Sequence, residues 1–206
     1  TENNNIDTKE DRPCMDISIA PGTKNEGVHI PVIISQAGLK DMVYNDFYIG
    51  ENGDVTIVAG CGIHNCGDQE SRHDGIHSFF VGKNARVRYI EKHYGEGDGN
   101  GENVMNPTTI VDLGENAYME METTQIKGID STYRDTQAHL SDGATLIIKE
   151  KIMTHGHQHA ETNFSVALDG YDSSTNVISR SVAKDHPSQM FNSTIRGNNK
   201  CAGHSE

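Results

Sequence analysis

The stretch IGENGDVTI, residues 49–57, decides the fold because the chain repeats its pattern several times. The pattern is an apolar residue, a turn rich in Gly, Asn and Asp, a small residue and then alternating apolar positions. It returns as VGKNARVRY at 81–89, LGENAYMEM at 113–121 and LSDGATLII at 140–148. Two degenerate copies begin at Leu168 and Ile195. Repetition at a fixed period is typical of solenoids and repeat arrays.

The spacing of the copies is regular. The leading apolar residues stand at positions 49, 81, 113, 140, 168 and 195, in steps of 32, 32, 27, 28 and 27 residues. Each is followed by a turn that contains Gly, Asn or Asp, residues that tolerate the left-handed backbone of a tight corner. Each copy therefore begins with a sharp turn.

A strand follows each turn. Counted from the leading residue, offset four is small, and offsets six and eight are apolar between mostly polar neighbours. The apolar pairs are Val55 and Ile57, Val87 and Tyr89, Met119 and Met121, and Leu146 and Ile148. This alternation indicates strands with one buried face. The sequence predicts an all-β protein, a parallel β-helix (β-solenoid) with repeats of about 27–32 residues. The alternative is a β-sandwich with coincidental spacing.

Composition limits the class of protein and its partners. The 206 residues suit one domain, and 21 glycines with 34% hydrophobic residues suit a turn-rich solenoid. The net charge of −13 disfavours nucleic acid and anionic membranes as partners. We expect no membrane span and no signal peptide. The four cysteines lack the spacing of a disulfide framework, which indicates reduced thiols and a cytoplasmic location.

The sequence predicts a short N-terminal segment followed by one domain. Residues 1–13 are polar and are expected to be poorly ordered. Residues 14–206 are expected to form a single β-helix domain, truncated at its C-terminal end, with an entry strand at 28–34. The Gly-rich acidic segment 95–103 lacks the Lys and the following helix of a phosphate-binding loop.

A first group of Cys and His residues surrounds the end of the first repeat. Thiols and imidazoles so close in sequence are suited to a soft or borderline metal such as zinc or iron. The pair of cysteines has no second matching pair, so the alternative is one buried thiol with several surface histidines. The residues are Cys61, His64, Cys66, His73 and His77.

A second group is HGHQHAE, residues 155–161. Alternate residues of a strand share a face, so a strand here would align His155, His157, His159 and Glu161. The motif also resembles the metal-binding motif of cupins and would suit a metal-dependent β-fold enzyme. The alternative is a solvated ladder of histidines.

A third group closes the sequence. Cys201, His204 and Glu206 lie within six residues and offer a thiolate, an imidazole and a carboxylate. Counted from Ile195, Cys201 falls at offset six, an inward position, so the alternative is a buried structural thiol.

The stretch RGNNKCAGHSE, residues 196–206, resembles the SufB/SufD family of iron–sulfur cluster assembly proteins. Three further stretches support the resemblance, which extends over roughly residues 28–206. They are RHDGIH at 72–77, YIEKHYG at 89–95 and MTHG at 153–156. The sequence is most similar to the shorter, SufD-like members and to a fragment of their core domain.

This resemblance implies a right-handed parallel β-helix and a non-enzymatic scaffold that holds an iron–sulfur cluster transiently. It implies three partners: a SufC-type ABC ATPase, a SufB/SufD-type paralogue or a second copy of the chain, and indirectly a sulfur-donor protein. Cys201, His204 and Glu206 occupy the matching region. The other hypotheses are the cupin-like enzyme and a purely structural solenoid that binds a partner along its flank.

Overall fold

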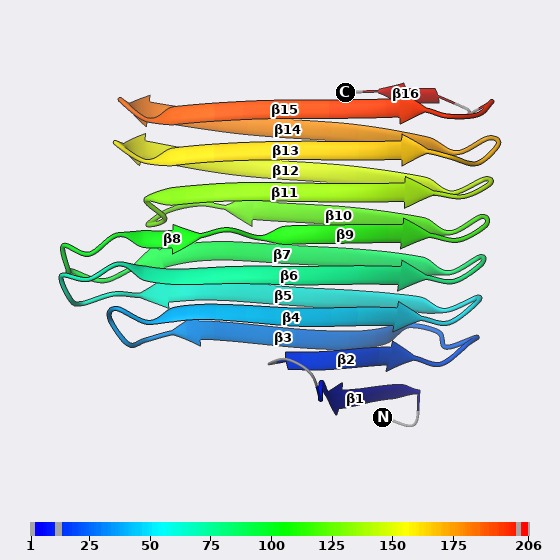
Figure 1. The fold of residues 1–206 in the computed structure, drawn as a ribbon, viewed down its shortest axis with the longest axis horizontal. Helices are drawn as coiled ribbons and strands as arrows, with labels where there is room; N and C mark the ends of the chain where they lie inside the picture. Colours follow the sequence, from blue (N-terminus) through cyan, green and yellow to red (C-terminus); the bar gives the residue numbers. More distant parts are fainter. Residues whose placement is uncertain (1–2, 11–13, 201–202, 206) are drawn as a thin grey trace.

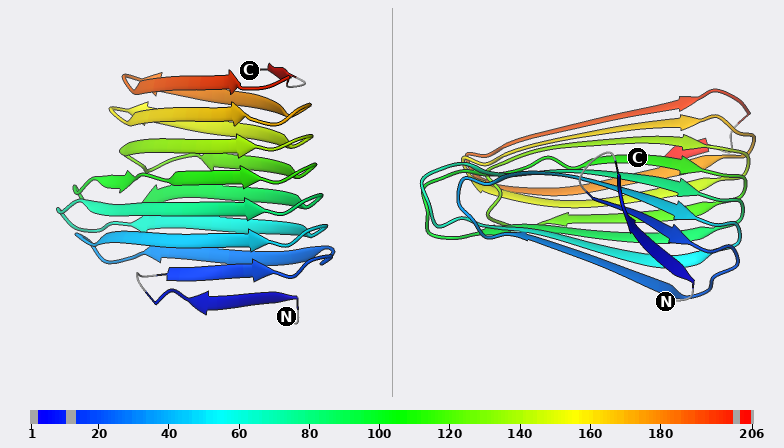
Figure 2. Two further views of the ribbon diagram at one scale, coloured as in Figure 1. Left: turned by 45° about the vertical axis from the view of Figure 1, so that its right-hand side comes forward. Right: turned by 60° about the horizontal axis from the view of Figure 1, so that its bottom comes forward.

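The computed structural model describes residues 3–10, 14–200 and 203–205, which form an all-β solenoid (Figure 1). Two sheets lie face to face, and the coils stack along one direction (Figure 2). Among these residues no helix is long and apolar enough to cross a membrane. The prediction of an all-β parallel solenoid is confirmed.

Successive strands alternate between the two sheets. Sheet A contains β1 (Asn4–Thr8), β2 (Cys14–Ile19), β4 (Lys40–Ile49), β6 (Ser71–Val81), β8 (Asn103–Met105), β9 (Thr108–Leu113), β11 (Ser131–Leu140), β13 (His159–Leu168) and β15 (Ser188–Gly197). Sheet B contains β3 (Glu26–Ile34), β5 (Asp54–His64), β7 (Arg86–Glu96), β10 (Tyr118–Gln125), β12 (Thr145–Gly156), β14 (Ser174–Asp185) and β16 (Gly203–Ser205). All neighbouring pairs among the described strands are parallel except β1 and β2.

The repeats are in register, as the sequence predicts. Val55, Val87, Met119 and Leu146 are consecutive Cα partners across β5, β7, β10 and β12. Ile57, Tyr89, Met121 and Ile148 form the next column, and both columns are buried in the core. Each leading apolar residue from Ile49 to Leu168 is the last residue of a sheet A strand.

The last predicted repeat is displaced. Leu168 pairs with Gly197, not with Ile195, so the predicted leading position at Ile195 is wrong. The reason is coil length: the predicted step from Leu168 to Ile195 is 27 residues, but Asp169 and Asn198, at equivalent places on successive coils, are 29 positions apart. The turn residues of this repeat are degenerate, so the sequence does not reveal that the coil is longer.

One set of corners is built on residues with a left-handed backbone. Asn52, Asn84 and Asn116 have φ of 58°, 58° and 55°, a conformation that asparagine tolerates better than most residues. The side chains continue the ladder, since Asn84 Nδ2 donates to Asn52 Oδ1 at 3.2 Å. Gly143, with φ of 65°, follows the next strand of sheet A.

The opposite corners explain the Gly-rich segment 95–103. A Cβ on Gly97, Gly99 or Gly101 would lie only 2.0, 2.3 or 2.1 Å from the backbone of the previous coil at Asn65, Gly67 and Gln69. Real Cβ atoms essentially never come so close. These glycines are therefore required by stacking of backbone on backbone.

The N-terminal edges of the two sheets differ. Residues 4–8, expected to be poorly ordered, instead form β1 and cover the edge of β2 by antiparallel pairing. Lys9 then inserts a side chain that is 5% exposed and forms ion pairs with Asp16 and Asp46. The edge of sheet B is β3, the predicted entry strand, whose Pro31 lacks an N–H and so discourages pairing with another chain.

Truncation of a core column provides a test of the packing. We expect Met121→Ala to lower the free energy of unfolding by about 2–5 kcal/mol. Met121 is fully buried between the sheets, so truncation of its side chain leaves a cavity. Urea unfolding followed by far-UV circular dichroism measures the change. Ser165→Ala, on the exposed face of β13, is the control and should change the value by about 0.5 kcal/mol or less. Equal effects of the two variants would contradict the assigned inward face.

Candidate functional site

The inward side of β7 changes from apolar to ionisable along its length. Val87 and Tyr89 belong to the hydrophobic core, whereas Glu91 and His93, at the next two inward positions, are buried polar residues. Burial of charged groups requires partners that replace water. The partners come from the facing sheet and from the next coils of the same sheet.

Arg134 on β11 is the central partner. Its Nη1 donates to Glu91 Oε2 at 2.7 Å, and its Nε lies 3.6 Å from Glu150 Oε2 on β12. All three side chains are 2% exposed. One guanidinium thus links two carboxylates from different coils inside the solenoid.

Hydrogen bonds extend this group in both directions. Tyr89 Oη donates to Glu91 Oε1 at 2.9 Å, and His77 Nδ1 lies 2.8 Å from the same hydroxyl. His93 Nε2 lies 3.4 Å from Glu91 Oε1. We call these six residues the interior network: His77, Tyr89, Glu91, His93, Arg134 and Glu150.

The far end of the interior network approaches a cavity. Glu150 accepts hydrogen bonds from Thr162 Oγ1 and Ser179 Oγ, each at 2.9 Å. The cavity beside Glu150 is lined by Ser179, Ser181 and Gln189 from the later coils. Polar groups therefore run through the interior from β6 to β14, and they meet the apolar columns at the hydroxyl of Tyr89.

The charge states follow from burial and pairing. Burial alone would raise the pKa of Glu91, but His93 and Arg134 outweigh it and hold that pKa well below its ordinary value. Burial lowers the pKa of His93 despite its contact with Glu91. Burial also lowers the pKa of His77, to about 4. At neutral pH the interior network therefore contains ionised Glu91 and Arg134 beside neutral imidazoles.

Cys61 lies next to the interior network. It is the Cα partner of His93 on the neighbouring strand, and its side chain is buried. Burial, followed by the charge of Glu91, raises the pKa of the Cys61 thiol to about 12. Cys61 therefore carries a protonated thiol at neutral pH.

The other members of the first predicted group separate into two places. His73 and His77 are inward residues of β6, and His73 Nδ1 lies 3.0 Å from Asp41 Oδ2. His64 and Cys66 lie together at the corner after β5, with Cys66 Sγ 3.1 Å from His64 Nε2. The five residues are thus divided between the interior and a corner.

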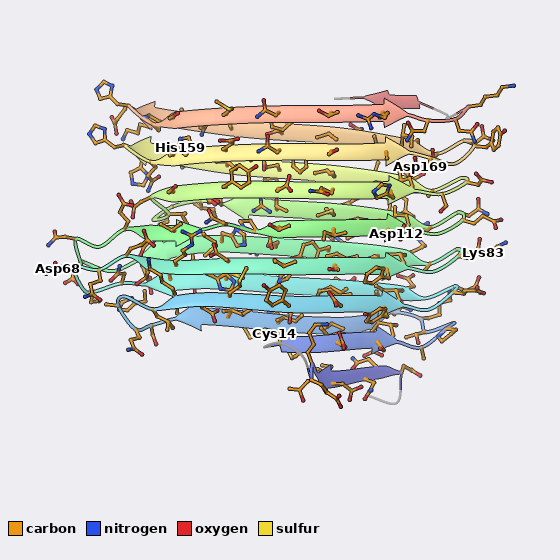
Figure 3. The ribbon with its side chains drawn as sticks, in the orientation of Figure 1. Cys14, Asp68, Lys83, Asp112, His159 and Asp169 are labelled. Carbon is orange, nitrogen blue, oxygen red and sulfur yellow. The ribbon has the colours of Figure 1, made fainter. Side chains whose placement is uncertain are left out.

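The second predicted group does not lie on one strand. β12 ends at Gly156, whose φ is 63°, and β13 begins at His159. His155 therefore belongs to sheet B, His159 and Glu161 belong to sheet A, and His157 is in the turn between them, beside the ring of His186. Figure 3 shows His159 at the start of its strand. The expected alignment on one face is wrong, because the turn interrupts the alternation.

The third predicted group lies at the limit of the described chain. Cys201 and Glu206 are outside the described residues, and His204 belongs to β16. Thr175, an inward residue of β14, has His204 as its Cα partner. The predicted inward position of Cys201 stays a prediction, because that residue is outside the part of the chain that the structure describes.

None of the described residues forms a group of three or more His, Cys, Asp or Glu arranged to hold a metal ion. Sequence reasoning missed most of the interior network: Tyr89, Glu91, His93, Arg134 and Glu150. A signal for part of it was present, since Glu91 and His93 continue the inward alternation of Val87 and Tyr89.

Comparison with known proteins gives a match over most of the chain. A protein-family model described as "SUF system FeS cluster assembly, SufBD core domain" matches residues 35–205. No curated protein matches the sequence. The matched range begins directly after β3 and includes the whole interior network.

Removal of the central cation tests the pairing in the interior network. We expect Arg134→Met to lower the free energy of unfolding by about 3–5 kcal/mol, because it leaves Glu91 and Glu150 buried without their cation. Arg88→Met, on the exposed face of β7, is the control, with an expected change of about 0.5 kcal/mol or less. Adding Glu91→Gln to Arg134→Met should recover part of the loss. No recovery in the double variant would contradict the assigned ion pair.

Acid should destabilise the fold through His77. The unfolded chain binds a proton at His77 near its ordinary pKa of 6.5, and the folded chain only near pH 4. Stability therefore falls as the pH is lowered through this window, by about 2 kcal/mol between about pH 7.5 and about pH 5 from His77 alone. His77→Gln should lose that part of the pH dependence, and His29→Gln, at an exposed site on β3, should keep it. Urea unfolding at several pH values measures both slopes, and identical slopes would refute the assignment.

Proposed function

Because the chain belongs to the SufBD core domain family of the SUF system for FeS cluster assembly, we propose that it is a non-enzymatic scaffold on which an iron–sulfur cluster is assembled. The observation that carries this function is the family match over residues 35–205. That range contains the stacked coils from β4 to β15. The cluster is the cargo of the scaffold and is held transiently.

The chemistry required of the scaffold is ligation of iron by thiolate, imidazole or carboxylate while sulfide is supplied. Cys201, His204 and Glu206 are the proposed ligands, since they offer these three groups within six residues. The pairing of β16 with β14 supports this assignment, because it brings the segment onto the last coil of sheet B.

Three partners fit this role in the cytoplasm. A SufC-type ABC ATPase would supply the energy of ATP, a SufB/SufD-type paralogue or a second copy would complete the cluster site, and a donor protein would supply sulfur. The thiols Cys14, Cys61 and Cys66 are free, which suits a reducing compartment. Co-elution of the purified proteins would identify the partners.

Anaerobic reconstitution with ferrous iron and sulfide tests the scaffold. We expect the protein to develop the visible absorption of an iron–sulfur cluster and to retain iron and acid-labile sulfide through desalting. Cys201→Ala should retain roughly a tenth or less of that absorption, because loss of a thiolate removes a cluster ligand.

Cys14→Ala is the matched control, since Cys14 lies on β2, at the other end of the solenoid from β16 (Figure 3). It should assemble a cluster as the unchanged protein does. Equal cluster contents in Cys201→Ala and the unchanged protein would exclude Cys201 as a ligand. Iron retained without sulfide would exclude the scaffold function.

A further inference from the structure

The outer face of sheet B carries an apolar column near the C-terminal ends of its strands. Ile33 and Tyr94 are both Cα partners of Gly62, from the strands on either side, and Met153 is the Cα partner of Val182. The ring of Tyr94 lies over Gly62, where an added Cβ would be 2.6 Å from Tyr94 Cζ, so the glycine leaves no gap. Ile126 directly follows β10, which pairs with β7 and β12. We call these residues the apolar column: Ile33, Tyr94, Ile126, Met153 and Val182.

The apolar column is open to solvent. Its exposure ranges from 44% at Met153 to 64% at Ile33, and Tyr94 is half-buried. The column crosses sheet B from β3 to β14, strands that lie one above another along the stack of coils (Figure 1). Continuous apolar surface on a protein commonly marks an interaction site.

A second column, two residues earlier on each strand, is cationic. Lys92 and Lys151 are both Cα partners of Thr124, and Arg180 is the Cα partner of Lys151. Lys151 Nζ donates to Glu122 Oε1 at 2.6 Å. Lys92 and Arg180 are exposed, and neither forms an ion pair with a residue that the structure describes. We call Lys92, Lys151 and Arg180 the cationic column.

The outer face of sheet A is arranged differently. Met42, Tyr133 and Met190 are also exposed and also share a column. Carboxylates interrupt that column, because Asp74 is the Cα partner of Met42, and Glu161 lies between Tyr133 and Met190. On sheet B the apolar and charged side chains are instead sorted into neighbouring columns.

The spacing of the coils selects the shape of the partner. Neighbouring strands are about 4.8 Å apart, so the five steps from β3 to β14 span about 24 Å. Side chains on one face of an α-helix recur about every 5.4 Å, whereas those on one face of an extended strand recur about every 6.6 Å. A helix laid along the stack of coils therefore stays nearly in step with both columns, and about 16 residues would cover them.

The charge beside the apolar column selects the chemistry of that helix. The two columns are about 6.6 Å apart, which is less than the width of about 10 Å that one helix covers. A helix whose apolar stripe lies on the apolar column therefore places one flank against Lys92 and Arg180. Acidic side chains on that flank would pair with both cations. An anionic membrane extends over the whole molecule, and the net charge of −13 opposes its approach.

We propose that the outer face of sheet B is a docking site for an amphipathic α-helix of a protein partner, with aspartate or glutamate along one flank of its apolar stripe. The apolar column supplies the buried area. The cationic column sets the direction of the helix, because a reversed helix would turn its acidic flank away from Lys92 and Arg180. The described residues of this chain form no helix, so a second copy of them does not supply one.

Two stapled helical peptides test the docking site on the full chain. The first has about 18 residues, with leucine at i, i+3, i+4 and i+7 and glutamate along one flank of that stripe. The second has lysine in place of each glutamate. Fluorescence anisotropy of the labelled peptides measures Kd. We expect the glutamate peptide to bind about tenfold or more tightly than the lysine peptide. The net charge of −13 alone would favour the opposite order.

Substitutions locate the binding on the two columns. Met153→Asp should weaken binding of the glutamate peptide by about tenfold or more, because it puts a carboxylate into the apolar column. Tyr133→Asp, at a comparably exposed site on sheet A, is the matched control and should bind as the unchanged protein does. Joint replacement of Lys92→Glu and Arg180→Glu should reverse the preference between the two peptides. Far-UV circular dichroism checks that each variant keeps its strands.

Several outcomes would overturn the proposal. These are equal affinity for the two peptides, no binding of either peptide, or undiminished binding by Met153→Asp. Sedimentation velocity and flotation with vesicles of anionic phospholipid test other occupants. A dimer or a vesicle complex that Met153→Asp abolishes would assign the face to a second copy or to a membrane instead. These measurements use neither iron nor sulfide, so their outcome is independent of the scaffold function.

Discussion

Contact of each coil with the backbone of the coil before it is the constraint on which the rest of the structure depends. Parallel pairing in both sheets places each residue above its counterpart, so one position is repeated as a column through the molecule. At each corner the chain must therefore turn without increasing the distance between neighbouring coils. The left-handed asparagines satisfy the constraint at one set of corners, and the alternate glycines of segment 95–103 satisfy it at the other.

The same register creates an interior with two chemical characters. The columns of Val55 and Ile57 are apolar apart from the hydroxyl of Tyr89, and the inward positions further along the strands contain the rest of the interior network. A buried ion pair is weak evidence for stability, because desolvation opposes the attraction between the charges. Arg134 connects Glu91 of one coil with Glu150 of another, so a shift of one coil would leave a charge without its partner. We therefore assign the interior network a role in fixing the register of the coils.

The fold could be predicted from the sequence because its signal is local. Turn, small residue and alternating apolar positions lie within nine residues, so each copy indicates its own strand. Prediction failed where the outcome depends on distant residues. Glu91 and Arg134 are 43 positions apart, and no local pattern pairs them. The group from His155 to Glu161 alternates in sequence, but the turn after Gly156 places its members on two sheets. His64 and Cys66, which the sequence suggests for metal binding, lie together at a corner, and Glu96, which lies 3.4 Å from His64, had no local signal because it belongs to the next coil.

The most direct test of the scaffold is Mössbauer spectroscopy of the protein purified anaerobically from cells grown on isotopically enriched iron. The scaffold function predicts the quadrupole doublets of tetrahedral iron bridged by sulfide, together with equal amounts of iron and acid-labile sulfide. A spectrum of isolated iron with oxygen or nitrogen ligands, and no sulfide, would contradict it.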